Sequence, residues 1–310
     1  MLSITIPIYN EAGSIGLLYE KVRNAMEKQP QPWELVLVND GSSDGSDEML
    51  DEIAAKDARV KVVHFRRNFG QTAAMMAGFD FSTGEVIVPM DGDLQNDPED
   101  IPKLLAKLDE GFDVVSGWRK DRQDNALKRN LPSIMANRLI SWVSGVRLHD
   151  FGCSLKAYRR EVVEGVRLYG EMHRFLPIYA KWHGAEIAEV VVRHHARAHG
   201  NSKYGLERVL KVLADLITVK FLDRFQQKPM YLFAGVGLLF LIISLFTFVL
   251  SFFFIGSLGF TTAVTGTAGV LCILMGLLAE MIVRTFYESQ GKRVYMVRAT
   301  RNFEAKPAGT

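Results

Sequence analysis

The chain has 310 residues, 48% of them apolar, and its mean hydropathy of +0.06 is high for a fully soluble protein. This composition excludes a disordered or collagen-like protein. The formal net charge of +2 hides four unequal parts, because residues 1–192 carry −6, 193–228 carry +5, 229–283 carry −1 and 284–310 carry +4. We therefore expect an acidic domain, a basic segment, a nearly uncharged span and a basic tail.

Apolar runs and helical patterns alternate through the first 120 residues. Strands are expected at Leu2–Tyr9, Trp33–Asn39, Val60–Phe65, Glu85–Met90 and Asp113–Gly117. Helices are expected between them at Ile15–Gln29, Asp47–Lys56, Gln71–Phe81 and Pro98–Glu110. This alternation predicts an α/β fold with a doubly wound, mostly parallel sheet. Ligands bind at the carboxyl ends of the strands in such sheets, so the polar residues after each strand form the candidate site.

An acidic triplet follows the fourth predicted strand. Asp91 and Asp93 are separated by one glycine, and Gln95 supplies a further oxygen. Hard oxygen ligands of this kind suit Mg²⁺ or Mn²⁺ bridging the two phosphates of a diphosphate. The alternative is a solvated acidic turn, which the position directly after a strand disfavours.

Asp40 ends the second predicted strand and opens a loop rich in Gly, Ser and Asp. A carboxylate at this place can accept hydrogen bonds from a base or a ribose. It can equally close its own loop as an Asx-turn, and the sequence leaves the two alternatives open. The sequence has neither a P-loop nor a dinucleotide-binding glycine pattern.

Three histidines, His194, His195 and His199, fall within six residues. Zinc binding is disfavoured because neighbouring arginines would repel a cation and no Cys or acidic ligand is adjacent in the sequence. We expect a basic loop that faces phosphate or membrane instead. Two amphipathic helices, at Leu127–Val143 and Leu206–Phe225, are expected to lie at a lipid surface, with packing on the domain as the alternative.

Two long apolar stretches, Met230–Ile255 and Phe260–Val283, predict a transmembrane hairpin rather than a pair of core helices. Glu280 near the end of the second stretch is interpreted as structural or interfacial rather than as a proton relay. Basic residues flank the hairpin on both sides and are missing from its connecting loop. The positive-inside rule therefore predicts that both termini and the domain before the hairpin lie on the cytoplasmic side of an inner or plasma membrane. No signal peptide is expected at Met1.

Five glycines in the hairpin would allow close helix contacts, including those of a homo-oligomer. These glycines are Gly235, Gly237, Gly266, Gly269 and Gly276. The two cysteines, Cys153 and Cys272, lie in different regions and cannot form a disulfide framework or a cysteine-based metal site.

Several motifs together resemble the family 2 glycosyltransferases, which have a GT-A-like fold. They are Ile6-Pro7-Ile8-Tyr9-Asn10-Glu11, Asp40-Gly41-Ser42 and Asp91-x-Asp93-x-Gln95-x-x-Pro98-Glu99. Three more resemble the polyprenyl-phosphate (dolichol-phosphate) glycosyltransferase branch, and the hairpin resembles its bacterial members that transfer glucose. They are Arg66-x-Asn68-Phe69-Gly70, Asp150-Phe151-Gly152 and Arg197-x-x-Gly200-x-Ser202-Lys203-Tyr204.

The resemblance implies a role for each matching residue. Base and ribose contacts are implied for Pro7, Tyr9, Glu11 and Asp40. Asp91 would touch the nucleotide sugar, while Asp93 and Gln95 hold the metal on the diphosphate. The lipid phosphate would be bound by Arg119, Arg129 and Ser133, and the donor phosphates by a closing loop with Arg197, Ser202 and Lys203.

The resemblance implies metal-dependent, inverting transfer of one hexose from a nucleotide sugar to polyprenyl (undecaprenyl) phosphate, with UDP-glucose as the favoured donor. The Q-x-x-R-W motif of processive synthases is absent, and His173-Arg174-Phe175 occupies its approximate region, which favours a single transfer. GDP-mannose and UDP-N-acetylhexosamine are alternative donors. A non-catalytic module that binds anionic lipid is the alternative of another class. The expected partners are the donor, the lipid acceptor and the membrane, with no nucleic acid among them.

Overall fold

The computed structural model describes residues 1–120, 137–138, 140–142, 144–166, 168, 172–195, 230–251, 258–288 and 295–303. They belong to two compact units. The first comprises Met1–Asp215 together with Arg293–Thr310, and the second comprises Leu216–Lys292. The chain therefore leaves the first unit once and returns to it.

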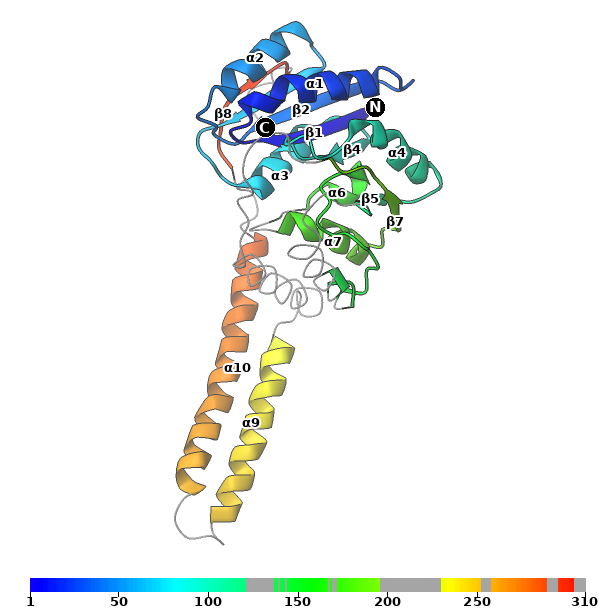
Figure 1. The fold of residues 1–310 in the computed structure, drawn as a ribbon. Coiled ribbons are helices and arrows are strands. Elements are labelled where there is room, and N and C mark those ends of the chain that lie inside the picture. Colours follow the sequence, from blue (N-terminus) through cyan, green and yellow to red (C-terminus); the bar gives the residue numbers. More distant parts are fainter. Residues whose placement is uncertain are drawn as a thin grey trace. The chain divides into compact units, whose positions relative to one another are not determined.

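The first unit is built on a mixed β-sheet with strand order β7-β5-β6-β4-β1-β2-β3-β8 (Figure 1). The strands are β1 (Leu2–Ile8), β2 (Trp33–Asn39), β3 (Val60–Phe65), β4 (Val86–Pro89), β5 (Val114–Trp118), β6 (Lys156–Arg159), β7 (Ile187–Val191) and β8 (Val297–Arg301). The neighbouring pairs β4-β1, β1-β2, β2-β3 and β5-β7 are parallel, whereas β6 and β8 run antiparallel to their neighbours. The predicted doubly wound, mostly parallel sheet is therefore confirmed, and the carboxyl ends of β1 to β4 share one edge.

Helices cover both faces of this sheet. They are α1 (Ala12–Met26), α2 (Ser46–Lys56), α3 (Gln71–Phe81), η1 (Pro98–Asp100), α4 (Ile101–Asp109), α6 (Arg160–Val163), η3 (Met172–Phe175) and α7 (Leu176–Trp182). Alternation along β2 sends Leu35 and Leu37 into a core beneath α1, α2 and α4. Val36 and Val38 point into the opposite core beneath α3. Both faces of β2 are thus buried, which explains its continuous apolar sequence.

The last described segment, residues 295–303, was not expected to be a strand. Val297–Arg301 forms β8, which pairs antiparallel with β3 at the edge of the sheet. Arg298 lies 3.2 Å from Asp47, and Arg301 lies 2.8 Å from Asp51. Two arginines of the basic tail are therefore paired with carboxylates of α2.

The second unit contains two helices long and apolar enough to cross a membrane, α9 (Met230–Ser251) and α10 (Leu258–Glu288). Most side chains along their apolar spans are exposed, unlike those of a core helix in a soluble domain. The helices approach closely at two glycines, since a Cβ on Gly237 would lie 2.8 Å from the carbonyl oxygen of Gly269. Ser244 also donates to the carbonyl oxygen of Thr262 at 2.9 Å. These small residues therefore serve contacts within the hairpin.

Candidate active site

The acidic turn lies between β4 and η1, at the carboxyl edge of the sheet. Gln71, the first residue of α3, donates from Nε2 to Oδ1 of Asp91 at 2.8 Å. Ser154 donates a further hydrogen bond to Asp91 and accepts one of 2.7 Å from Asn96. Two segments outside the turn thus hold the first carboxylate of the predicted pair.

Asp93 occupies a bend whose backbone is unusual. The Gln95 N–H donates to Asp93 Oδ1 at 3.1 Å, and Leu94 between them has a φ of +62°. A branched residue in this left-handed region is strained, and such strain gathers at functional sites. The Leu94 side chain is 4% exposed, so burial in the core fixes the bend that sets the directions of Asp93 and Gln95.

The charge around Asp91 fits a cation and an anionic ligand. Burial raises the pKa of Asp91, and the neighbouring Asp93 carboxylate raises it further. Arg119 and Arg174 act on Asp91 in the opposite direction. Two neighbouring carboxylates that repel each other would suit a hard divalent cation.

Arg119 follows β5 and is oriented by an acidic loop. Its Nε and Nη2 lie 2.7 and 3.1 Å from the two carboxylate oxygens of Asp150, a two-pronged pairing that fixes the guanidinium plane. Asp150 also accepts the Gly152 N–H at 3.1 Å. The buried Lys156 ammonium binds the carbonyl oxygens of Phe151 and Cys153. This loop therefore brings Arg119 close to Asp91.

Sequence reasoning assigned no site role to His173 or Arg174. Nδ1 of His173 lies 2.7 Å from the hydroxyl of Thr72, the second residue of α3. Burial lowers the pKa of His173 to about 3, and the charges of Arg174 and Lys156 act in the same direction. His173 is thus a neutral anchor that joins η3 to α3 and keeps Arg174 near Asp91. The sequence did contain a signal for this part of the site, since the triplet His173-Arg174-Phe175 occupies the approximate region of the processive-synthase motif.

Asp40 is 3% exposed, and its carboxylate binds the loop after β3 rather than its own loop. The N–H groups of Phe69 and Gly70 donate to it at 2.7 and 3.0 Å. Burial raises its pKa, although these two hydrogen bonds lower it. Gly41 (φ +69°) is required here because a Cβ would lie 2.5 Å from the Arg67 carbonyl carbon. Asp40 therefore joins the second and third predicted site loops.

The first site loop is joined to the second in a similar way. Asn10, with a φ of +55°, accepts the Ser43 N–H at 2.8 Å and donates its own N–H to the Ser42 hydroxyl at 3.0 Å. Tyr9 is 41% exposed beside this junction, and Glu11 accepts a hydrogen bond of 2.9 Å from Ser14. The structure thus gathers Pro7, Tyr9, Glu11 and Asp40 at the carboxyl ends of β1 and β2.

The histidine-rich segment is described as far as His195, where its side chains meet the acidic residues after the turn. His195 Nε2 lies 3.0 Å from Asp97, and Arg193 lies within 3.5 Å of carboxylates of Asp97, Glu99 and Asp100. Arg193 therefore pairs with the acidic residues after the turn. Among the described residues no group of three or more His, Cys, Asp and Glu side chains could hold a metal ion, and the expectation for the three histidines stays a prediction because His199 is not described.

Several predicted residues lie outside the described residues. They are Arg129, Ser133, Arg197, His199, Ser202 and Lys203. The same is true of the amphipathic helix at Leu206–Phe225 and of most of Leu127–Val143, while the side chain of Glu280 is also not described. Their assigned roles remain predictions.

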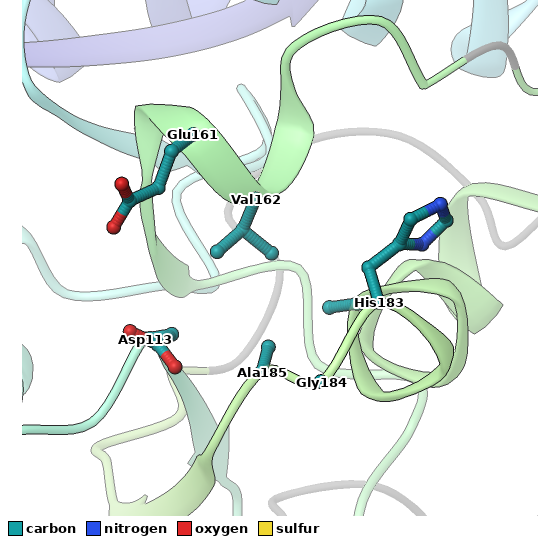
Figure 2. Close-up of a pocket in the computed structure, with 7 residues that line it drawn as sticks. Asp113, Glu161, Val162, His183, Gly184 and Ala185 are labelled. Atoms are coloured by element: carbon teal, nitrogen blue, oxygen red, sulfur yellow. The ribbon is translucent and has the colours of Figure 1, made fainter.

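A cavity of about 210 Å³ lies elsewhere in the domain (Figure 2). Asp113, Glu161 and His183 contribute polar groups to its wall. Asp113 immediately precedes β5, so this cavity is at the amino end of the strand, opposite the edge where ligands bind in α/β sheets. It contains none of the predicted site residues.

A mostly parallel sheet with an acidic turn at its carboxyl edge defines a GT-A-like glycosyltransferase domain. A model of the family described as glycosyl transferase family 2 matches residues 3–167, and the chain belongs to this family. One solved structure with this fold is glucosyl-3-phosphoglycerate synthase from Mycobacterium tuberculosis, in complex with Mn²⁺, uridine diphosphate and phosphoglyceric acid. Its TM-score is 0.55 at 18% identity, over 71% of this chain and 78% of that chain.

Curated relatives extend the similarity beyond the catalytic domain. A dodecaprenyl-phosphate galacturonate synthase from Rhizobium johnstonii is 42% identical over 310 residues, covering 96% of this chain and 92% of the relative. An undecaprenyl-phosphate 4-deoxy-4-formamido-L-arabinose transferase from Pseudomonas aeruginosa is 42% identical over 219 residues. That alignment covers 70% of this chain, which spans 64% of the relative's length. The chain is therefore a glycosyltransferase.

Proposed function

We propose that this glycosyltransferase moves one sugar from a nucleoside diphosphate to a polyprenyl phosphate at a membrane surface. The observation that carries the proposal is the turn from Asp91 to Gln95, fixed by Gln71 and flanked by two arginines. The names of the two curated relatives support the acceptor, since both contain a polyprenyl phosphate. The two apolar helices would keep the enzyme at the surface where this lipid resides.

The proposed reaction is an in-line attack by an acceptor phosphate oxygen on the anomeric carbon, with inversion and departure of the nucleoside diphosphate. A phosphate monoester has a second pKa near ~6, so it is largely a dianion at pH 7 and needs little help from a general base. The greater task is to hold two anions together. Arg119, with its plane fixed by Asp150, is assigned to the acceptor phosphate together with Arg129 and Ser133.

Asp93 and Gln95 are the residues proposed to hold a divalent metal, with Asp91 beside them. Such a metal would stabilise the negative charge of the departing diphosphate. The mycobacterial synthase is in complex with Mn²⁺ and uridine diphosphate, which supports Mn²⁺ as the first ion to test, with Mg²⁺ as the second. Pro7, Tyr9, Glu11 and Asp40 are proposed to hold the base and ribose, while Arg197, Ser202 and Lys203 close over the donor phosphates.

The identity of the transferred sugar is the most detailed part of the proposal. The resemblance favoured UDP-glucose, whereas a galacturonate synthase is 42% identical to this chain over 92% of its own length. Two formamido-arabinose transferases match over similar shares of their length, 92% and 93%, at 36% and 34% identity. Arg174 beside Asp91 supplies a positive charge that would suit a uronic acid carboxylate. We therefore propose UDP-galacturonate as the first donor, ahead of UDP-glucose and UDP-4-deoxy-4-formamido-L-arabinose.

The return of the chain to the sheet supports one membrane topology. β1 and β8 belong to the same sheet, so the segments before and after the helical pair fold into a single unit. A folded unit lies on one side of a membrane, and two crossings return the chain to that side. The basic flanks support the cytoplasmic side.

Purified full-length protein, Mn²⁺ and undecaprenyl phosphate, assayed with separate donors, test the proposal. The panel adds GDP-mannose and UDP-N-acetylglucosamine to the three UDP-sugars above. With an active donor, mass spectrometry should detect undecaprenyl phosphate that carries one residue of the donor's sugar. Binding of anionic vesicles without metal-dependent nucleotide binding, and without product from any donor, would support the non-catalytic lipid-binding module instead.

A further inference from the structure

Tyr295 lies seven positions after Glu288, the last residue of α10. It is close to the loops that follow β2 and β3, which belong to the proposed nucleotide site. It is 6% exposed and stacks on Phe65, the last residue of β3, with ring centroids 4.9 Å apart at an angle of 14°. Phe65 in turn meets Phe69 edge to face at 5.6 Å. Because the Phe69 N–H donates to Asp40, two aromatic contacts connect Tyr295 with the loop that holds this carboxylate.

A second connection runs from the other end of β8. Arg301 lies 2.8 Å from Asp51, whose other oxygen lies 3.0 Å from Nε2 of the buried His64. Nδ1 of His64 lies 3.1 Å from the side-chain nitrogen of Asn39. The side-chain oxygen of Asn39 accepts the Ser42 N–H at 2.9 Å, so its nitrogen is the donor to His64. This arrangement places the His64 proton on Nε2, where it donates to Asp51.

The backbone adds a third connection. The Arg66 N–H donates to the carbonyl oxygen of Met296 at 3.0 Å, directly where β3 passes into the site loop. The register with β8 shifts between His64 and Phe65, so the last pairing of the two strands is adjusted at the start of that loop. Tyr295, the Met296 carbonyl group and Arg301 are therefore each connected to the loops that contain Ser42 and Phe69.

We propose that Tyr295 is a positioning residue for nucleotide binding, acting through Phe65 and Phe69 on Asp40. The inference rests on the proposed function and extends it, because it makes donor affinity depend on the segment that follows the membrane hairpin. The loops that contain Ser42 and Phe69 have all of these contacts only when residues 295–303 are paired with the sheet. A nucleotide sugar is then bound tightly only by a chain whose hairpin is followed by a docked β8.

Substitutions of Tyr295 in the full-length protein test this inference by titration calorimetry with UDP, and separately GDP, in the presence of Mn²⁺. Tyr295→Ala should raise the Kd of the bound nucleotide about tenfold, since it removes the aromatic contact on Phe65. Tyr295→Phe keeps the ring and loses the 2.8 Å hydrogen bond to Asp80, so its Kd should stay within about twofold of the wild type.

Phe303→Ala is the matched control. Phe303, at the other end of the same segment, packs on Phe81 with ring centroids 5.1 Å apart, whereas Tyr295 stacks on Phe65. Its loss should lower Tm as Tyr295→Ala does and leave the nucleotide Kd unchanged. Equal Kd values for Tyr295→Ala and the wild type would overturn the inference, as would an equal rise in Phe303→Ala. A wild-type protein that binds neither nucleotide would overturn the proposed function itself.

Discussion

Gln71 donates a 2.8 Å hydrogen bond from its side-chain amide to Oδ1 of Asp91, joining the first turn of α3 to the acidic turn after β4. The next residue of the helix, Thr72, lies 2.7 Å from His173. One end of α3 thus positions both the first carboxylate and the element that carries Arg174. The site is assembled around this helix terminus.

Gln71→Ala should lower kcat/KM for the donor about tenfold to a hundredfold, because it removes a hydrogen bond to a charged group. Gln71→Glu should be more damaging, since it adds a third negative charge beside Asp91 and Asp93. Steady-state kinetics with varied donor measures both effects. Gln31→Ala, at the amino edge of the sheet, is the control; an equal loss in this control would remove the argument for Gln71.

Asp93→Ala should lower kcat at least about a hundredfold, because the proposed metal would lose a ligand and would stabilise the departing diphosphate less well. The measurement is the transfer rate as a function of Mn²⁺ concentration. Asp109→Asn, at the exposed end of α4, is the control for a general change in surface charge. Full activity of Asp93→Ala that still requires metal would contradict the assignment of this ligand.

Arg119→Lys should raise the KM for polyprenyl phosphate about tenfold and change the donor KM less, because lysine cannot reproduce the two-pronged pairing with Asp150. Arg129→Ala should show the same preference for the acceptor. Kinetics with each substrate varied in turn provide the measurement. Equal changes in both KM values would argue against the acceptor role of these arginines.

Burial of His173 should make the free energy of unfolding depend on pH. Its pKa is lowered to about 3 mainly by burial, so the unfolded chain binds a proton below about pH 6.5 that the folded chain does not. The free energy of unfolding should therefore fall as the pH decreases from 6.5, by at most about 1.4 kcal/mol per pH unit from this group. Urea unfolding at pH 7, 6 and 5 should show this slope reduced in His173→Asn. An unchanged slope would place the acid sensitivity in other groups.

Local sequence patterns predicted β2, β3 and α3 with the bounds observed, since continuous apolar strands and periodic helices depend on their own residues. The same patterns located Asp91 and Asp93 after a strand. β8 could not be found in this way, because Val297–Arg301 alternates weakly and its pairing depends on a strand more than 200 residues earlier. Long-range pairing has no local signal.

The partners of the site residues were equally hidden in the sequence. Asp40 was expected either to bind a nucleotide or to close its own loop, yet its carboxylate binds backbone N–H groups 29 and 30 residues away. Arg193 and Arg298 contribute to the basic stretches of the sequence, and each pairs with a carboxylate distant in sequence, Asp97 and Asp47 respectively. Net charge along a chain shows the amount of charge and does not show its pairing.

The most direct test of the central claim compares undecaprenyl phosphate with undecaprenol as acceptors for the purified full-length enzyme, with the active donor and Mn²⁺. The phosphate is the attacking group in this account, so sugar should transfer to undecaprenyl phosphate alone and transfer should stop when the metal is chelated. Equal transfer to undecaprenol, or undiminished transfer to the phosphate lipid after chelation, would contradict it.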